Sequence, residues 1–165
     1  MKVHTYRESF ETGRAAELVV IKWLENKFPE DKIIDVSKNK EFYGPDIDAL
    51  ITSPELTEEI GDGDYSFKPN YFVLWQEGRC RLAAEIKKDR WDVPLKFGTQ
   101  NFAYEKISHT TYDTLGCHRK TQADVLIHVS SDLKRLLYID DVPAFREWCE
   151  RYIEQHPERE QAIPN

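Results

Sequence analysis

Two short segments, DIDALIT at 46–52 and LAAEIKK at 82–88, set acidic side chains inside apolar runs that have the composition of buried β-strands. Because strand side chains alternate between the faces of a sheet, Glu85 and Lys87 must share one face of the second segment, and Ile86 takes the other. Charged groups gathered on one face of a sheet are costly unless something compensates them. The chain must therefore fold into a sheet that keeps one face for its core and part of the other for charge.

The length and composition are those of one α/β domain that spans residues 1–165. Of the 165 residues, 40% are hydrophobic and 32% charged, so the chain can bury a sizeable core without disulfides. Its three cysteines contain no CxxC pair, and no apolar run is long enough to cross a membrane, so we expect an intracellular, cytoplasmic protein. The net charge of −7 argues against a basic overall surface that would bind nucleic acid, but it is compatible with a local basic surface near a cleft.

Hydrophobic periodicity predicts a central mixed β-sheet flanked by helices. We expect an amphipathic helix at 9–28, strands at 32–39 and 46–52, an exposed acidic excursion at 53–70, a hairpin at 71–88 that turns at Glu77 and Gly78, and strands at 101–108 and 123–130. The strand at 101–108 could instead begin a helix. An additional strand and helix are expected within 135–156, with Asp141 as the helix N-cap.

Asp46, Glu85 and Lys87 come together if the two acid-bearing strands are neighbours in the sheet. Two carboxylates and a lysine then share a small patch, and a divalent cation bound by oxygen ligands is a natural compensating charge. Mg²⁺ needs only one or two carboxylates, together with water and a substrate phosphate. Asp48 shares the face of Asp46 by strand alternation and is a rival ligand, and the pairing register of the strands decides between them.

These residues resemble the motif of the PD-(D/E)XK, or restriction-endonuclease-like, nuclease superfamily. The resemblance rests on Pro45 and Asp46, on the EIK sequence at 85–87, and on Glu17 in the helix GRAAELVVIKWL. It implies a restriction-endonuclease-like core of one helix, three strands of a mixed sheet, a second helix and a further strand. The sequence departs from this pattern in two respects, because the gap between the two motif segments is long and the second core helix is not evident.

The resemblance implies a role for each motif residue. Asp46, Glu85 and the main-chain carbonyl of Ile86 would bind the metal. Lys87 would be the catalytic lysine, which orients a water molecule or offsets the negative charge that develops on the phosphate. Glu17 would assist through a metal-bound water. The expected cofactor is Mg²⁺, for which Mn²⁺ can substitute.

Two further patterns after the lysine motif imply incompatible local structures. A QxxxY pattern at Gln100 and Tyr104 is similar to one that the nuclease domains of recombination and repair helicases carry on a helix, where both residues would contact DNA. The stretch TQNFAYEKIS, followed by CHRKTQADVLIHV, instead resembles small phage and mobile-element nucleases, in which Glu105 would be an accessory acid. The histidines lack the spacing of metal ligands. Short basic runs supply the candidate phosphate contacts Lys88, Arg90, Arg119 and Lys120.

Together, the residues and the resemblance predict a Mg²⁺-dependent nuclease that hydrolyses DNA phosphodiester bonds with metal-activated water. The resemblance implies the preference for DNA and a setting in DNA repair, recombination, restriction or phage DNA metabolism. The alternative is a catalytically inactive nuclease-fold domain that binds nucleic acid or protein, which the acidic composition favours. A structural subunit whose strand acids pair with lysines is a third hypothesis. Cutting both strands of a duplex would favour a homodimer.

Overall fold

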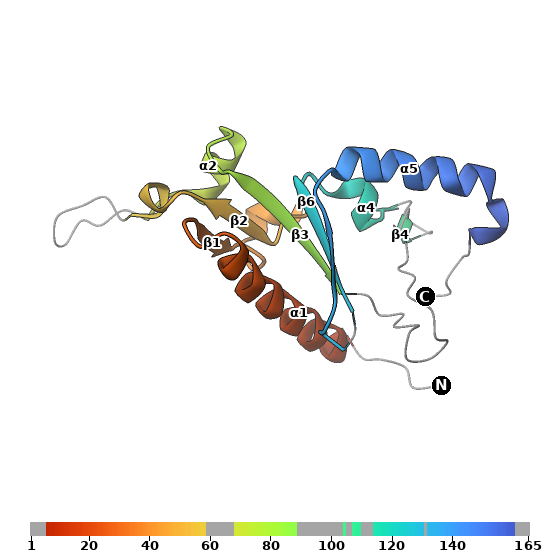
Figure 1. The fold of residues 1–165 in the computed structure, drawn as a ribbon, viewed down its shortest axis with the longest axis horizontal. Helices are drawn as coiled ribbons and strands as arrows, with labels where there is room; N and C mark the ends of the chain where they lie inside the picture. Colours follow the sequence, from red (N-terminus) through yellow and green to blue (C-terminus); the bar gives the residue numbers. More distant parts are fainter. Residues whose placement is uncertain are drawn as a thin grey trace.

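Five strands form a mixed sheet at the centre of the computed structural model, in the order β1-β2-β3-β6-β7 (Figure 1). The strands are Lys32–Asp35 (β1), Ala49–Thr52 (β2), Leu82–Lys88 (β3), Val125–Val129 (β6) and Leu136–Ile139 (β7). β3 and β6 are parallel, and the other neighbouring strands pair antiparallel. The structure describes residues 6–58, 68–88, 104, 107–109, 114–130 and 132–160, and these form a single α/β domain, as predicted.

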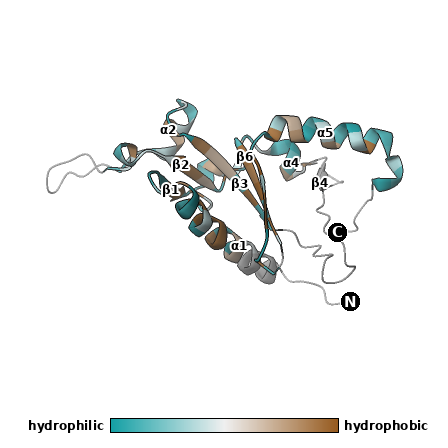
Figure 2. Cartoon of the chain, viewed as in Figure 1, coloured by the Kyte–Doolittle hydropathy of each residue, from teal (hydrophilic) through white to brown (hydrophobic). Residues whose placement is uncertain are grey.

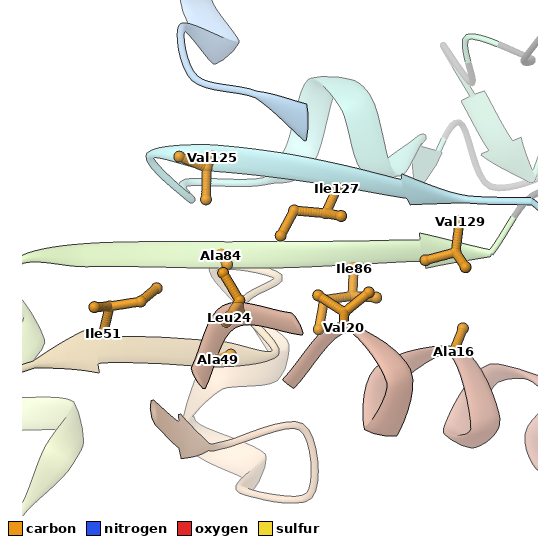
Figure 3. Packing of buried hydrophobic residues seen from close by; sticks show 10 residues of the cluster. All are labelled: Ala16, Val20, Leu24, Ala49, Ile51, Ala84, Ile86, Val125, Ile127 and Val129. Atoms are coloured by element: carbon orange, nitrogen blue, oxygen red, sulfur yellow. The ribbon is translucent and has the colours of Figure 1, made fainter. Parts of the chain in front are cut away.

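The helix α1 (Tyr6–Lys27) covers one face of the sheet (Figure 1). Ala16, Val20 and Leu24 recur at four-residue steps, so they project from one side of the helix, and all three are buried. Figure 3 shows these side chains pointing toward buried side chains of β2, β3 and β6, with which they form an apolar layer. The amphipathic helix predicted from the sequence is confirmed, and its burial fixes the core face of β3.

Short helices and a longer C-terminal helix lie on the side of the sheet opposite to α1 (Figure 1). They are the 3₁₀ helix η1 (Lys40–Tyr43) and the α-helices α2 (Tyr71–Gln76), α4 (Cys117–Lys120) and α5 (Val142–Gln155). A second apolar cluster forms here around the buried Phe42, Leu50 and Ala83. Figure 2 shows that β3 and β6 are mainly hydrophobic, whereas α5 is mainly hydrophilic. The core therefore lies in the central strands.

The first half of the predicted hairpin is wrong, because it forms the helix α2. The side-chain oxygen of Asn70 caps this helix by accepting a hydrogen bond from the N–H of Val73 at 3.1 Å. Gly78 follows the helix with a φ of 67°, a left-handed conformation that glycine adopts easily. The helical spacing places the rings of Phe72 and Trp75 against the buried ring of Phe42 in η1, at centroid distances of 5.3 and 5.9 Å. This packing outweighs the β-propensity of the segment, whereas the second half of the hairpin is confirmed as β3.

The strands expected at 32–39 and 46–52 are shorter in the structure than predicted. β1 ends at Asp35, whose carboxylate accepts hydrogen bonds from the main-chain N–H and the hydroxyl of Ser37 and so begins a turn. β2 begins at Ala49, because Asp46 has a φ of 59°, which no strand residue adopts. Asp46 therefore does not follow strand alternation, whereas Asp48 directly precedes the strand and bonds to β3.

The C-terminal strand and helix are confirmed as β7 and α5, and Asp141 caps α5 by accepting a hydrogen bond from the N–H of Ala144 at 2.9 Å. The strand expected at 101–108 lies largely outside the described residues. The remaining described elements are the 3₁₀ helix η2 (Pro54–Thr57) at the start of the acidic excursion, the paired strands β4 (Ile107–His109) and β5 (Thr114–Leu115), and the 3₁₀ helix η4 (Pro157–Arg159).

Candidate functional site

Asp48, which directly precedes β2, lies beside Glu85 of β3. Ala49, the first residue of β2, pairs antiparallel with Ala84 of β3, and Asp48 and Glu85 are the residues just beyond this pair. The N–H of Asp48 donates to the carbonyl of Ala84 at 2.9 Å, and its carboxylate accepts a hydrogen bond from the N–H of Ile86 at 2.9 Å. A further hydrogen bond joins the carboxyl groups of Asp48 and Glu85, which we call the carboxyl pair. The register thus brings the rival ligand, Asp48, to Glu85.

Burial is the main cause of a raised pKa at both members of the carboxyl pair. Glu85 is only 6% exposed, and burial together with the charges of Asp48 and Asp46 raises its pKa well above the ordinary value, against a smaller lowering by Lys87. Burial raises the pKa of Asp48 to about 6, although its hydrogen bonds with Ile86 and Glu85 lower it. Two acids that share a hydrogen bond hold a proton between them unless another positive charge takes its place. The pair therefore favours a proton or a cation.

Asp46 does not enter the strand, contrary to the prediction. Its φ of 59° lies in the left-handed region, where residues other than glycine are uncommon. The segment that follows α4 holds it there. Thr121 Oγ1 donates to the carbonyl of Asp46 at 2.9 Å, Lys120 Nζ lies 3.2 Å from its carboxylate, and the N–H of Gln122 donates to the carbonyl of Pro45 at 2.8 Å. The charge of Asp46 nevertheless raises the pKa of both acids of the carboxyl pair, so it acts on them from nearby.

Glu17 of α1 is the second acid that acts on the carboxyl pair from nearby, because its charge raises the pKa of Asp48. Its carboxylate accepts a hydrogen bond from Arg14 at 2.8 Å. The same guanidinium lies 2.7 Å from the carboxylate of Asp35 and 3.1 Å from the hydroxyl of Ser37. Arg14 is not among the predicted site residues, and its only signal in the sequence is the three-residue spacing to Glu17 on one helix face.

Lys87 follows Glu85 by two residues on β3 and points to the same face, as predicted. The charge of Lys87 lowers the pKa of Glu85 and of His128, which is the residue in register with it on the parallel strand β6. Ile86 lies between the two charged residues and faces the core under α1. Lys88 is half-buried at the end of the strand. The predicted alternation of charged and apolar positions along β3 is confirmed.

A buried histidine pair, which the sequence did not predict, lies beside Lys87. The Nε2 atoms of His118 and His128 lie 2.9 Å apart, and the two rings stack at a centroid distance of 5.0 Å. Burial, followed by the charges of His118 and Lys87, lowers the pKa of His128 to about 3. Cys117 Sγ lies 3.2 Å from Nδ1 of His118. The two histidines are not spaced in the sequence as metal ligands usually are. They meet because His118 of α4 contacts His128 of β6.

Two of the predicted phosphate contacts have partners within the protein. Arg119 donates through two nitrogens to the two carboxylate oxygens of Glu150, at 2.7 and 2.8 Å. The hydroxyl of Tyr104 donates to the same carboxylate at 2.8 Å, and burial and this carboxylate raise the pKa of Tyr104. Lys120 donates to the carbonyl of Tyr43 at 2.8 Å in addition to its contact described above. The predictions for Arg90, Gln100 and Glu105 lie outside the described residues.

The donor chemistry of the carboxyl pair fits Mg²⁺. Both acids supply carboxylate oxygens, which are hard ligands, and Mg²⁺ is commonly bound by one or two carboxylates. Across the part of the chain that the structure describes, no group of three His, Cys, Asp or Glu side chains is arranged to bind a metal ion. Asp46, which would be the third acid, faces Lys120 instead. The fit therefore rests on Asp48 and Glu85.

Comparisons of the chain with protein-family models, curated proteins and solved structures found no match. Among the described residues, no helix combines the length and the apolar character that crossing a membrane requires. The function is therefore inferred from the site and the fold.

Proposed function

We propose that this chain is a Mg²⁺-dependent nuclease that hydrolyses DNA phosphodiester bonds. The carboxyl pair carries the proposal, because Asp48 and Glu85 are joined by a hydrogen bond, burial raises the pKa of both, and Lys87 follows on the same face. Two buried acids that repel each other are stabilised by a divalent cation as well as by a proton. When bound, such a cation would polarise a phosphoryl oxygen and lower the pKa of a water molecule.

The neighbouring residues have roles that suit phosphodiester hydrolysis. Asp48 takes the ligand role that the resemblance implied for Asp46. Lys87 brings a positive charge to the face of the carboxyl pair, where it can offset the negative charge that develops on the phosphate. Glu17, whose charge acts on Asp48, is suited to accept a hydrogen bond from a water molecule beside the pair and so to orient it.

The order of elements supports a restriction-endonuclease-like core. In chain order, α1 is followed by β1, β2 and β3, and the short helix α4 and the strand β6 come after the paired strands β4 and β5. This is the order of helix, three strands, helix and strand that the family resemblance implies. The other described elements are additions to this core. η1 lies between β1 and β2, η2 and α2 lie between β2 and β3, β4 and β5 lie between β3 and α4, and β7, α5 and η4 follow β6. The helix missing from the predicted pattern corresponds in this proposal to α4, which has four residues.

Incubation of the protein with single-stranded, duplex and branched DNA, with Mg²⁺ or Mn²⁺ and with chelator, tests the proposal. We expect cleavage that requires the metal and that is lost in Glu85→Gln and Asp48→Asn. Glu25→Gln is the matched control, because it neutralises an exposed acid of α1 that pairs with Lys22. Cleavage that survives both substitutions in the carboxyl pair would contradict the proposal.

A second candidate is a catalytically inactive nuclease-fold domain that binds nucleic acid or protein. The net charge of −7 and the engagement of Arg119 and Lys120 by acids of the same chain favour it, because both reduce the positive charge available to a substrate phosphate. DNA binding without cleavage under any metal condition would support this candidate over the nuclease.

A further inference from the structure

Lys120 and Asp46 form a weak ion pair beside the carboxyl pair. Lys120 Nζ lies 3.2 Å from one carboxylate oxygen of Asp46 and donates to the carbonyl of Tyr43 at 2.8 Å. The side chains are 38% and 24% exposed, and a single lysine–carboxylate contact between partly exposed groups contributes about 1 kcal/mol or less. The nearby pair of Arg119 and Glu150 is different, with two contacts at 2.7 and 2.8 Å. Lys120 can therefore leave Asp46 with little loss of stability.

The main chain at Asp46 is held independently of this ion pair. Thr121 Oγ1 donates to the carbonyl of Asp46, and the N–H of Gln122 donates to the carbonyl of Pro45. Arg146 of α5 in turn donates to the carbonyl of Thr121 at 3.1 Å and so supports the segment from the other side. If Lys120 leaves, these contacts keep the left-handed main chain in place. The position of the Asp46 carboxylate is then set by its own side-chain torsions and no longer by the ion pair.

We infer that Lys120 and Asp46 are an exchangeable ion pair that completes the site when substrate arrives, an inference that rests on the proposed nuclease function. Lys120 neutralises Asp46 until a divalent cation binds the carboxyl pair. Asp46 then turns to the cation as a third oxygen ligand, and the ammonium group of Lys120 contacts a DNA phosphate. Lysine is a common phosphate ligand in proteins because its ammonium group is a compact charge with three donors. The exchange also explains why Asp46 faces Lys120 although its charge acts on both acids of the pair.

Titration of the protein with MnCl₂ tests the cation half of this inference. Lys120→Gln keeps a donor for the carbonyl of Tyr43 but removes the charge that competes for Asp46, and it should tighten Mn²⁺ binding about two- to fivefold. Asp46→Asn should weaken binding, and the double variant should bind as Asp46→Asn does, because the gain requires the freed carboxylate. Lys22→Gln, which removes an exposed lysine from an ion pair of the same length, is the control and should leave the affinity unchanged.

The inference would be overturned if Lys120→Gln did not tighten Mn²⁺ binding. It would also be overturned if Lys120→Gln tightened Mn²⁺ binding equally in the presence of Asp46→Asn. Melting curves show whether each variant folds. Should Lys120→Gln not fold, Lys120→Arg provides the opposite test, because a bidentate contact holds Asp46 more firmly and should weaken Mn²⁺ binding. Unchanged affinity in Lys120→Arg would then contradict the exchange.

Binding of a labelled DNA duplex to the Lys87→Ala protein, which we expect not to cleave, tests the phosphate half. With Mg²⁺, adding Lys120→Gln should lower the slope of log affinity against log salt by about 1, because one phosphate contact is lost. In chelator the slope should not change, since Lys120 then stays with Asp46. An equal change under both conditions would refute the exchange. Glu85→Gln separates the two proposals. If it does not weaken Mn²⁺ binding, the proposed nuclease function is refuted. If it weakens Mn²⁺ binding but Lys120→Gln has no effect, only the exchange of Lys120 is refuted.

Discussion

Substitution of Asp48 by asparagine is expected to stabilise the protein against unfolding at neutral pH in the absence of divalent cations. Burial raises the pKa of Asp48 from 3.8 to about 6, and at about 1.4 kcal/mol for each pKa unit this corresponds to about 3 kcal/mol. Asparagine has the shape of aspartate, so its side-chain oxygen can still accept the hydrogen bond from Ile86. Its amide can donate to the carboxylate of Glu85, and it brings no charge into the site.

The pH dependence of this effect follows from the raised pKa. A carboxyl group that retains its proton more strongly in the folded state contributes stability that is complete below its unfolded pKa of about 4, and this stability is lost as pH rises through about 6. Asparagine resembles the protonated acid. Wild type and Asp48→Asn should therefore be similarly stable near pH 4 and differ by about 3 kcal/mol above about pH 7.

His128 changes stability in the opposite direction over part of the same range. Burial lowers its pKa to about 3, so stability increases as pH rises from about 3 to the unfolded pKa of about 6.5 and is fully present above it. The wild-type curve alone combines the two effects. The difference between the variant and wild type removes the contribution of His128 and leaves that of the carboxyl pair, because the charge of Asp48 also raises the pKa of Glu85.

Urea unfolding in the presence of chelator, from about pH 4 to about pH 8, measures this difference. Glu25→Gln, which neutralises an exposed acid of α1, should give a difference curve close to zero at every pH. A flat curve for Asp48→Asn, or a variant that is less stable than wild type at the highest pH, would refute the conclusion that burial raises the pKa of Asp48.

Three further predictions test the site and its surroundings. Lys87→Ala is expected to slow DNA cleavage by about 100-fold or more, because the lysine offsets the negative charge that develops on the phosphate. The affinity for duplex DNA, measured by fluorescence anisotropy, should stay largely unchanged. Loss of binding with cleavage retained would contradict this role. Mg²⁺ at about 100 times its dissociation constant should stabilise wild type by about 2.7 kcal/mol in thermal melts and should stabilise Glu85→Gln far less. Arg119→Ala should lower the free energy of unfolding by about 1–3 kcal/mol, because it leaves the partly buried carboxylate of Glu150 without its bidentate partner. Arg151→Ala, which breaks an exposed ion pair within α5, should lower it by less than about 1 kcal/mol. Equal losses would show that the burial of the Arg119 pair does not matter.

The sequence predicted the elements whose hydrophobic period is long and regular. The four-residue steps of α1 and the N-cap of α5 at Asp141 identify both helices, and the alternation of β3 identifies its two faces. The helix α2 was missed because its six residues, which include three aromatic residues and a valine, fit a strand as well as a helix. Its packing onto the ring of Phe42 decides the outcome, and that contact joins segments about 30 residues apart in the chain.

The sequence also placed Glu85 and Lys87 on one face, because two residues on one strand must share it. It could not decide between Asp46 and Asp48, because both precede β2 at alternate positions. The decision depends on the left-handed conformation at Asp46, which contacts from Lys120 and Thr121 support across 74 and 75 residues of sequence. No local propensity of the segment encodes contacts at that separation, so only the folded chain determines which acid meets Glu85.

The two faces of β3 link the stability of the fold to the chemistry of the site. Ala84 and Ile86 pack under α1, and burial of one isoleucine side chain contributes about 1.5–3 kcal/mol, which is comparable to the cost of ionising Asp48. The apolar face therefore keeps β3 beside β2 while Glu85 repels Asp48 on the other face. The main chains at Asp48 and Glu85 cannot separate without disrupting this core, so the ionised carboxyl groups stay close until a proton or a cation binds. A cation that binds both acids should accordingly strengthen the pairing of β2 with β3, and slower amide exchange of Asp48 and Ile86 in Mg²⁺ than in chelator would measure that coupling.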